Sequence, residues 1–93
     1  MNDILDKLSD YSVSKDVLTA HLEGEAVLLH LKTKQYFRLN ETGAAIWKGL
    51  EQNLAASAIV ARLVQEFAIG SETARTELAR TIEDLKSREL LER

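Results

Sequence analysis

The chain has 93 residues, of which 45% are apolar and 29% charged, a composition typical of a single globular domain. The formal net charge of -3 gives no positive field for nucleic-acid phosphates, and the absence of cysteine excludes disulfides, thiolate metal ligands and thiol catalysis. The sequence shows neither a signal-peptide pattern nor the roughly 20 consecutive apolar residues that cross a bilayer, so we expect a cytoplasmic protein without a membrane partner.

Residues 1–15 are mostly polar and carry a short apolar pattern at Ile4, Leu5 and Leu8. This pattern predicts marginal helix. We therefore expect an N-terminal arm over residues 1–15, loosely attached and flexible, and a folded domain over residues 16–93.

Three strands are expected next. Residues 17–22 and 26–31 suit strands, and the break between them lies at Glu23-Gly24. A third strand, residues 35–39, follows a predicted three-residue loop, 32–34. All three would form an antiparallel sheet in which the second strand is central.

Alternation along the strands predicts which side chains share a face. In the predicted register, Lys34 takes a left-handed backbone that glycine usually adopts. The side expected to be exposed carries Thr19, His21, Leu28, His30, Tyr36 and Arg38. The expected core face carries Leu18, Ala20, Leu22, Val27, Leu29, Leu31, Phe37 and Leu39.

Helical spacing begins where the third strand ends. Asn40 is a suitable N-cap for a helix over residues 41–52. Apolar stripes predict a second helix over residues 55–68 and a third over 71–87, with Ser71 as its N-cap. Trp47 falls among the inward-facing positions of the first helix, which favours core packing.

Leu90 and Leu91 are expected to fold back and close the core. The predicted fold is therefore α+β, a three-stranded antiparallel sheet followed by three helices, whose last two resemble a winged helix-turn-helix. A DNA-binding regulator is one interpretation of that pair. The third helix opposes it, because residues 71–89 carry four positive and five negative side chains.

The residues that could support catalysis or metal binding do not form a recognisable site. His21 and His30 are expected to be exposed and too far apart to share a metal ion. The carboxylates of the last helix alternate with basic residues, as on a solvated face. No nucleophile and base can be named together, so we expect no enzyme activity, cofactor or metal.

Binding is the function that remains. The third strand, Gln35–Leu39, lies at an edge of the predicted sheet and has a free row of backbone hydrogen-bonding groups. Such an edge accepts a peptide by strand addition or pairs with a second copy in a structural homodimer. Alternatively, Lys34 and Arg38 protect it from association.

The sequence of residues 27–47 resembles that of the PqqD-like family, and the resemblance extends over residues 13–91. Its most specific part is Tyr36-Phe37-x-Leu39-Asn40-x-Thr42-Gly43-x-x-Ile46-Trp47. Two features depart from the family: Lys34 replaces a glycine in the turn, and the N-terminal arm is longer. Family members are recognition elements for RiPPs, the ribosomally synthesised and post-translationally modified peptides.

The resemblance implies a non-catalytic chaperone that binds the leader of a precursor peptide. The leader adds to the third strand and lies against the third helix. The partner is then a modifying enzyme, either a radical SAM enzyme or a leader peptidase with a macrocycle-forming synthetase, and the chain is a monomer or homodimer. Carried over from the family, the peptide-binding residues are Tyr36, Phe37, Arg38, Leu39, Arg75, Leu78, Ala79, Ile82 and Lys86.

Overall fold

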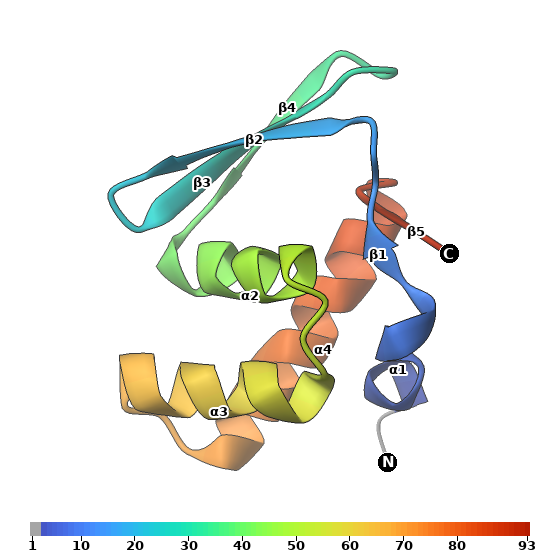
Figure 1. Ribbon diagram of the computed structural model, residues 1–93. Coiled ribbons are helices and arrows are strands. Elements are labelled where there is room, and N and C mark those ends of the chain that lie inside the picture. Colours follow the sequence, from blue (N-terminus) through green and yellow to red (C-terminus); the bar gives the residue numbers. More distant parts are fainter. Residues whose placement is uncertain (1–2) are drawn as a thin grey trace.

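The computed structural model describes residues 3–93, which form a three-stranded sheet, a two-stranded sheet and a set of helices (Figure 1). In chain order the elements are α1 (Asp3–Asp6), the 3-10 helix η1 (Leu8–Asp10), β1 (Ser12–Val13), β2 (Val17–Leu22), β3 (Glu25–His30), β4 (Gln35–Leu39), α2 (Glu41–Glu51), α3 (Ala56–Phe67), α4 (Ser71–Ser87) and β5 (Leu91–Glu92). The expected α+β class, with three antiparallel strands before three helices, is confirmed.

The three-stranded sheet has the order β2-β3-β4 and covers one side of the helices (Figure 1). Helix α2 lies directly beneath it, and α3 and α4 complete the helical layer. The core lies between these layers. Its largest fully buried side chains are Trp47, Leu28, Ile46, Ile59, Leu63, Leu78, Ile82, Leu85 and Leu90.

The turn between β3 and β4 sets a register that differs by one residue from the predicted one. His30 lies opposite Gln35, so the turn contains four residues, 31–34, where three were expected. The amide of Lys34 donates a hydrogen bond to the carbonyl of His30 at 2.8 Å and closes the turn. The left-handed backbone expected for Lys34 is confirmed, with a φ of 64°.

The predicted core face of β2 and β3 is wrong. Leu28 and Ala26 are completely buried, whereas Leu18 and Leu22 are 57% and 56% exposed. A slip of one residue exchanges the two faces of a strand. The helix-facing side of the sheet carries Val17, Thr19, His21, Ala26, Leu28, His30, Phe37 and Leu39. The other side, called the open face below, carries Leu18, Ala20, Leu22, Glu25, Val27, Leu29, Tyr36 and Arg38.

The ends of the helices follow the sequence closely, with one correction. The Oδ1 atom of Asn40 accepts a hydrogen bond from the amide of Gly43 at 2.9 Å, so the expected N-cap of α2 is confirmed. Helix α4, however, has Gly70 as its N-cap, and Ser71 is already its first helical residue without a capping bond. Trp47 is buried as expected, and its indole N–H donates to Thr19 Oγ1 at 3.0 Å.

The N-terminal segment lies along α4, away from the three-stranded sheet (Figure 1). Leu5 and Leu8 are only 6% and 4% exposed. Strand β1 pairs with β5, and neither of these two short strands is predicted from the sequence. The expected burial of Leu90 and Leu91 is confirmed. The flexibility expected for the arm stays a prediction, and its residues 1–2 lie outside the described part.

Candidate functional site

Strand β4 has a free edge. In the sheet order β2-β3-β4 it pairs with β3 on one side, and no other strand within residues 3–93 pairs with it on the other. The strand of the described N-terminal residues 3–15, β1, pairs with β5 and not with this edge. Every second residue of an edge strand directs its amide and carbonyl groups outward. Strand β4 therefore offers main-chain donors and acceptors to an added strand.

The side chains of β4 alternate between two environments. Tyr36 is 72% exposed and lies on the open face. Arg38 lies on the same side, and its guanidinium donates to Glu25 Oε1 at 2.7 Å and 3.1 Å. Phe37 and Leu39 are half-buried and pack against the core from the other side. A strand added to β4 would meet Phe37 and Leu39 on one side, and Tyr36 and the Arg38–Glu25 ion pair on the other.

The C-terminal end of α4 supplies the wall beside Phe37. The guanidinium carbon of Arg88, the residue after α4, lies 5.1 Å from the centroid of the Phe37 ring, a distance typical of a cation–π contact. Arg88 Nε also lies 3.1 Å from Asp84 Oδ1. Glu77 and Thr81 precede these residues at helical spacing, so this face of α4 is polar.

The helix residues expected to line the groove differ in their burial and in the face of α4 that they occupy. Leu78 and Ile82 are 0% exposed and belong to the core. The Lys86 ammonium lies 4.9 Å from the ring centroid of Tyr11, in the N-terminal segment. Arg75 and Ala79 share the helix face of Lys86, because they precede it by eleven and seven residues. Of the four expected β4 residues, Phe37 lies beside Arg88, whereas Lys86 lies beside Tyr11.

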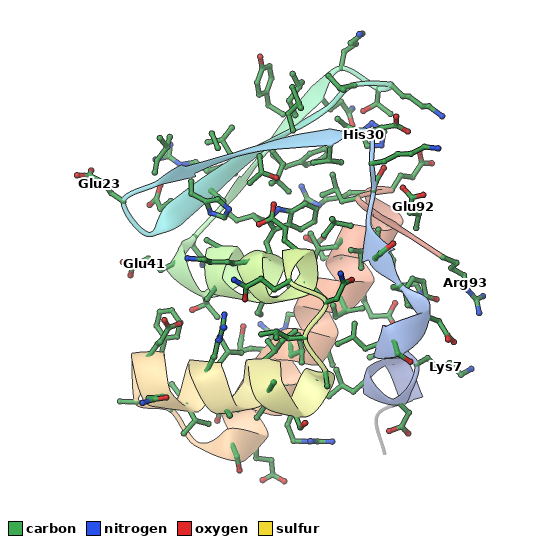
Figure 2. All side chains as sticks on the ribbon, viewed as in Figure 1. Lys7, Glu23, His30, Glu41, Glu92 and Arg93 are labelled. Carbon is green, nitrogen blue, oxygen red and sulfur yellow. The ribbon has the colours of Figure 1, made fainter. Side chains whose placement is uncertain are left out.

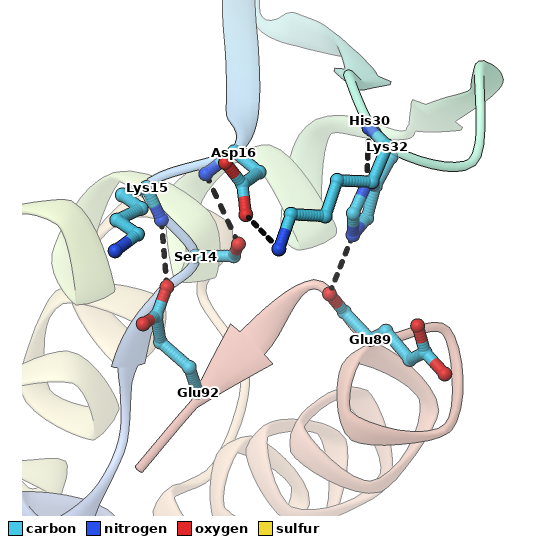
Figure 3. A network of polar contacts seen from close by, with 7 residues as sticks. All are labelled: Ser14, Lys15, Asp16, His30, Lys32, Glu89 and Glu92. Atoms are coloured by element: carbon cyan, nitrogen blue, oxygen red, sulfur yellow. Dashed lines mark hydrogen bonds and ion pairs between the residues drawn. The ribbon is translucent and has the colours of Figure 1, made fainter.

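His30 ties the β3–β4 hairpin to the end of α4 (Figure 3). Its Nδ1 accepts a hydrogen bond from the Lys32 amide at 3.2 Å, so the proton of the neutral ring sits on Nε2. Nε2 then donates to the Glu89 carbonyl at 3.1 Å. The side chain is 4% exposed, contrary to the expectation that it faces solvent. His30 therefore helps to hold β4 and Arg88 at a fixed separation.

Further polar contacts brace the same end of the sheet (Figure 3). The Lys32 ammonium lies 3.5 Å from Asp16 Oδ2, and the Lys15 amide donates to Glu92 Oε2 at 2.8 Å. Ser14 Oγ accepts from the Asp16 amide at 3.1 Å. The two sheets are thus joined where β2 begins and β5 ends.

The structure offers little for metal binding or catalysis. Within residues 3–93, no group of three or more His, Asp or Glu side chains is placed to hold a metal ion. His21 lies on the helix-facing side, contrary to expectation, and its Nε2 is 3.1 Å from Glu51 Oε1. A cavity of about 710 Å³ opens beside it, between the β2–β3 turn, α2 and α3, and its lining contains no hydroxyl or thiol nucleophile.

Helix α4 is poorly suited to contact nucleic acid. Arg80 and Arg88 each lie within 4 Å of a carboxylate of the same helix, Glu77 and Asp84 respectively. These pairs reduce the positive charge that phosphates would require. Among the described helices, none has the length and apolar character needed to span a membrane.

Comparison with known proteins agrees with this geometry. Residues 25–91 match the family model described as "Coenzyme PQQ synthesis protein D (PqqD)". The chain is 36% identical to the protein in the structure "TbiB1 in Complex with the TbiA(beta) Leader Peptide", with a TM-score of 0.82 over 87% of this chain and 94% of that one.

A second structure, "Lasso peptide synthetase B1 complexed with the leader peptide", shares the fold, with a TM-score of 0.80 at 20% identity over 89% of this chain and 98% of that one. No curated protein matches the sequence. The family model covers most of the chain, including the free strand β4 and helix α4. The chain therefore belongs to the PqqD family.

Proposed function

We propose that this protein binds the leader segment of a ribosomally made precursor peptide by strand addition to β4, and that it performs no chemistry itself. The free edge of β4 beside the end of α4 is the observation that carries the proposal. Family membership and the likeness to TbiB1, whose structure is a complex with a leader peptide, support it.

In this mode the leader adds as an antiparallel strand along Gln35–Leu39, and main-chain hydrogen bonds supply affinity that depends little on sequence. Alternate side chains of the leader supply specificity. One set lies on the side of Phe37 and Leu39 and reaches Arg88, and the other lies beside Tyr36 and Arg38.

A protein of this kind acts by delivering the bound peptide to a separate enzyme. That partner is a radical SAM enzyme in quinone cofactor synthesis and a leader peptidase with a macrocycle-forming synthetase in lasso-peptide synthesis. The proposal includes both kinds of partner enzyme and a cytoplasmic location.

Titration of the ¹⁵N-labelled protein with the TbiA(beta) leader, and with the leader of a precursor encoded beside this chain, tests the proposal. We expect the largest amide shifts at residues 35–39 and around Arg88. Unchanged spectra with both peptides would refute leader binding.

N-methylation of the peptide provides a matched control for strand addition. An N-methyl group removes one main-chain donor and leaves the side chain unchanged. Methylation at alternate positions, those whose amides face β4, should weaken binding by roughly tenfold or more, because each lost hydrogen bond leaves a β4 carbonyl unpaired. Methylation at the intervening positions should have little effect, whereas equal effects at all positions would argue against a strand.

A further inference from the structure

The open face of the sheet is unusually apolar for a surface with no cover. Leu18, Leu22 and Tyr36 are 57%, 56% and 72% exposed, and Leu29 and Val27 lie between them on the central strand. Glu25 and Arg38 interrupt this face, but they neutralise each other through a 2.7 Å ion pair. Contiguous apolar patches of this kind on small proteins often mark interaction sites.

Opposite charges lie at the two ends of this face. At the β2–β3 turn, Glu23 is exposed. Beneath the turn, at the start of α2, the Glu41 carboxylate lies so close to Gly24 that a Cβ there would be 3.1 Å from Glu41 Oε2. Figure 2 labels Glu23 and Glu41 at this end of the sheet and His30 at the other.

The His30 end carries a basic turn. The β3–β4 turn there, residues 31–34, carries two exposed lysines, Lys32 and Lys34, and no carboxylate. The carboxylates of this end come from other elements: Asp16 lies before β2, Glu89 after α4 and Glu92 in β5 (Figure 3). The strands therefore run between an acidic and a basic turn, and the apolar residues lie between them.

We propose that the open face binds a second copy of the same chain. The two faces stack with their strands antiparallel, related by a two-fold axis that lies between the sheets and runs across the strands. This arrangement brings the Glu23 end of each copy against the Lys34 end of the other. A two-fold axis along the strands would instead place like charges together, so the charge distribution selects one of the two symmetric arrangements.

The size of the face indicates a weak, reversible dimer. Strands of six residues at about 3.3 Å per residue, spaced about 4.8 Å apart, give a three-stranded face of roughly 300 Å² per copy. Stable complexes bury about 800 Å² per partner, so we expect dissociation in the micromolar to millimolar range. The stacked dimer leaves the main-chain edge of β4 free in both copies and shares only the side chains of Tyr36 and Arg38 with the proposed leader site, so it does not depend on leader binding.

Sedimentation equilibrium between about 10 μM and 1 mM protein tests the proposal. The average mass should rise above 10.4 kDa across this range. In the double variant Leu18→Thr/Leu22→Thr, dimerisation should weaken by at least roughly tenfold, because both exposed apolar contacts are lost while threonine still suits a strand.

A mass of 10.4 kDa throughout the range would overturn the proposal and leave the open face to another protein. Unchanged association of the double variant would also overturn it, and would point to pairing through the β4 edge. Strand β2 is the strand farthest from β4, so the double variant should bind the leader peptide normally. Sedimentation therefore tests dimerisation, peptide titration tests leader binding, and either proposal can fail without the other.

Charge reversal tests the antiparallel orientation. Glu23→Lys and Lys34→Glu should each weaken the dimer, because each puts like charges at the meeting ends. The combined variant Glu23→Lys/Lys34→Glu should restore it. Lys7→Glu is the matched control, since Lys7 is exposed on the N-terminal segment, remote from the face (Figure 2). Lack of rescue in the combined variant would rule out this orientation.

Discussion

His30 shows how one buried polar side chain can connect distant parts of a small domain. One ring nitrogen forms a hydrogen bond with the Lys32 amide in the β3–β4 turn, and the other with the carbonyl of Glu89, which follows α4. A ring with both nitrogens satisfied can be buried at little cost, whereas an unsatisfied one cannot. The burial of His30 and the placement of β4 against Arg88 therefore depend on each other.

The substitution His30→Leu should lower the free energy of unfolding by about 1–3 kcal/mol. Leucine retains most of the apolar volume but leaves the Lys32 amide and the Glu89 carbonyl without their partner. Urea unfolding followed by Trp47 fluorescence measures the change. His21→Leu is the control: His21 is exposed, its contact with Glu51 is a surface one, and its loss should change stability by less than about 0.5 kcal/mol. Equal effects of the two substitutions would contradict the connecting role of His30.

Arg88 and Lys86 are two cations of α4 and its C-terminal end, and each lies over a different aromatic ring. Arg88 covers Phe37 of β4, and Lys86 covers Tyr11 of the N-terminal segment. Only the first faces the strand to which the leader is proposed to bind. Peptide affinity should therefore distinguish them.

Arg88→Ala should weaken leader binding by roughly three- to tenfold, because a peptide beside Phe37 loses a charged hydrogen-bond donor and the apolar stem of arginine. Lys86→Ala should change affinity by less than about twofold. Calorimetric titration with the same leader peptide measures both. The opposite ranking would place the groove on the Lys86 side of α4, as the sequence resemblance predicts.

At the level of elements, the β3–β4 turn decides which side of the sheet becomes core. Strand β3 has apolar residues on both faces. The alternation of apolar residues therefore could not decide whether Ala26 and Leu28 or Val27 and Leu29 face the core. From the sequence, the pair with the larger side chains, Val27 and Leu29, is expected to face the core. The smaller pair is buried instead, since the turn contains four residues and His30 finds two main-chain partners.

Helix ends and strand limits were easier to predict, because local signals control them. Asn40 caps α2 as its sequence position indicates, and β4 spans the predicted residues, Gln35–Leu39. The strand part of the candidate site could therefore be read from the sequence. The helix part could not, because the contact of Arg88 with Phe37 depends on how α4 is oriented against the sheet.

The turn itself yields a stability prediction. Lys34 has a φ of 64°, a region that costs a residue with a Cβ about 1 kcal/mol and glycine almost nothing. Lys34→Gly should thus raise the free energy of unfolding by about 0.5–1 kcal/mol in urea denaturation. Thr33→Gly, in the same turn but without a positive φ, should lower it. Destabilisation by both substitutions would show that the left-handed backbone is not strained.

At the scale of the whole molecule, the two chain ends complete the domain. The pairing of β1 with β5 and the burial of Leu5 and Leu8 bring the N-terminal segment into the same core as α4. Its strand β1 does not pair with the free edge of β4. The arrangement suits a small binding protein, because both ends of the described chain stabilise the fold while the outer edge of β4 and one sheet face stay open.

Removing the core contact of the N-terminal segment should test its contribution to stability. Leu8→Ala should lower the free energy of unfolding by about 2–4 kcal/mol, since Leu8 is 4% exposed and its loss leaves a cavity beside the core. Leu18→Ala, which removes the same atoms from a side chain that is 57% exposed, should cost less than about 1 kcal/mol at low protein concentration. Leader affinity should stay unchanged in both folded variants, because neither residue lies on β4. If Leu8→Ala costs no more than Leu18→Ala, the Leu8 side chain adds little to the core, as expected for a loosely attached N-terminal arm.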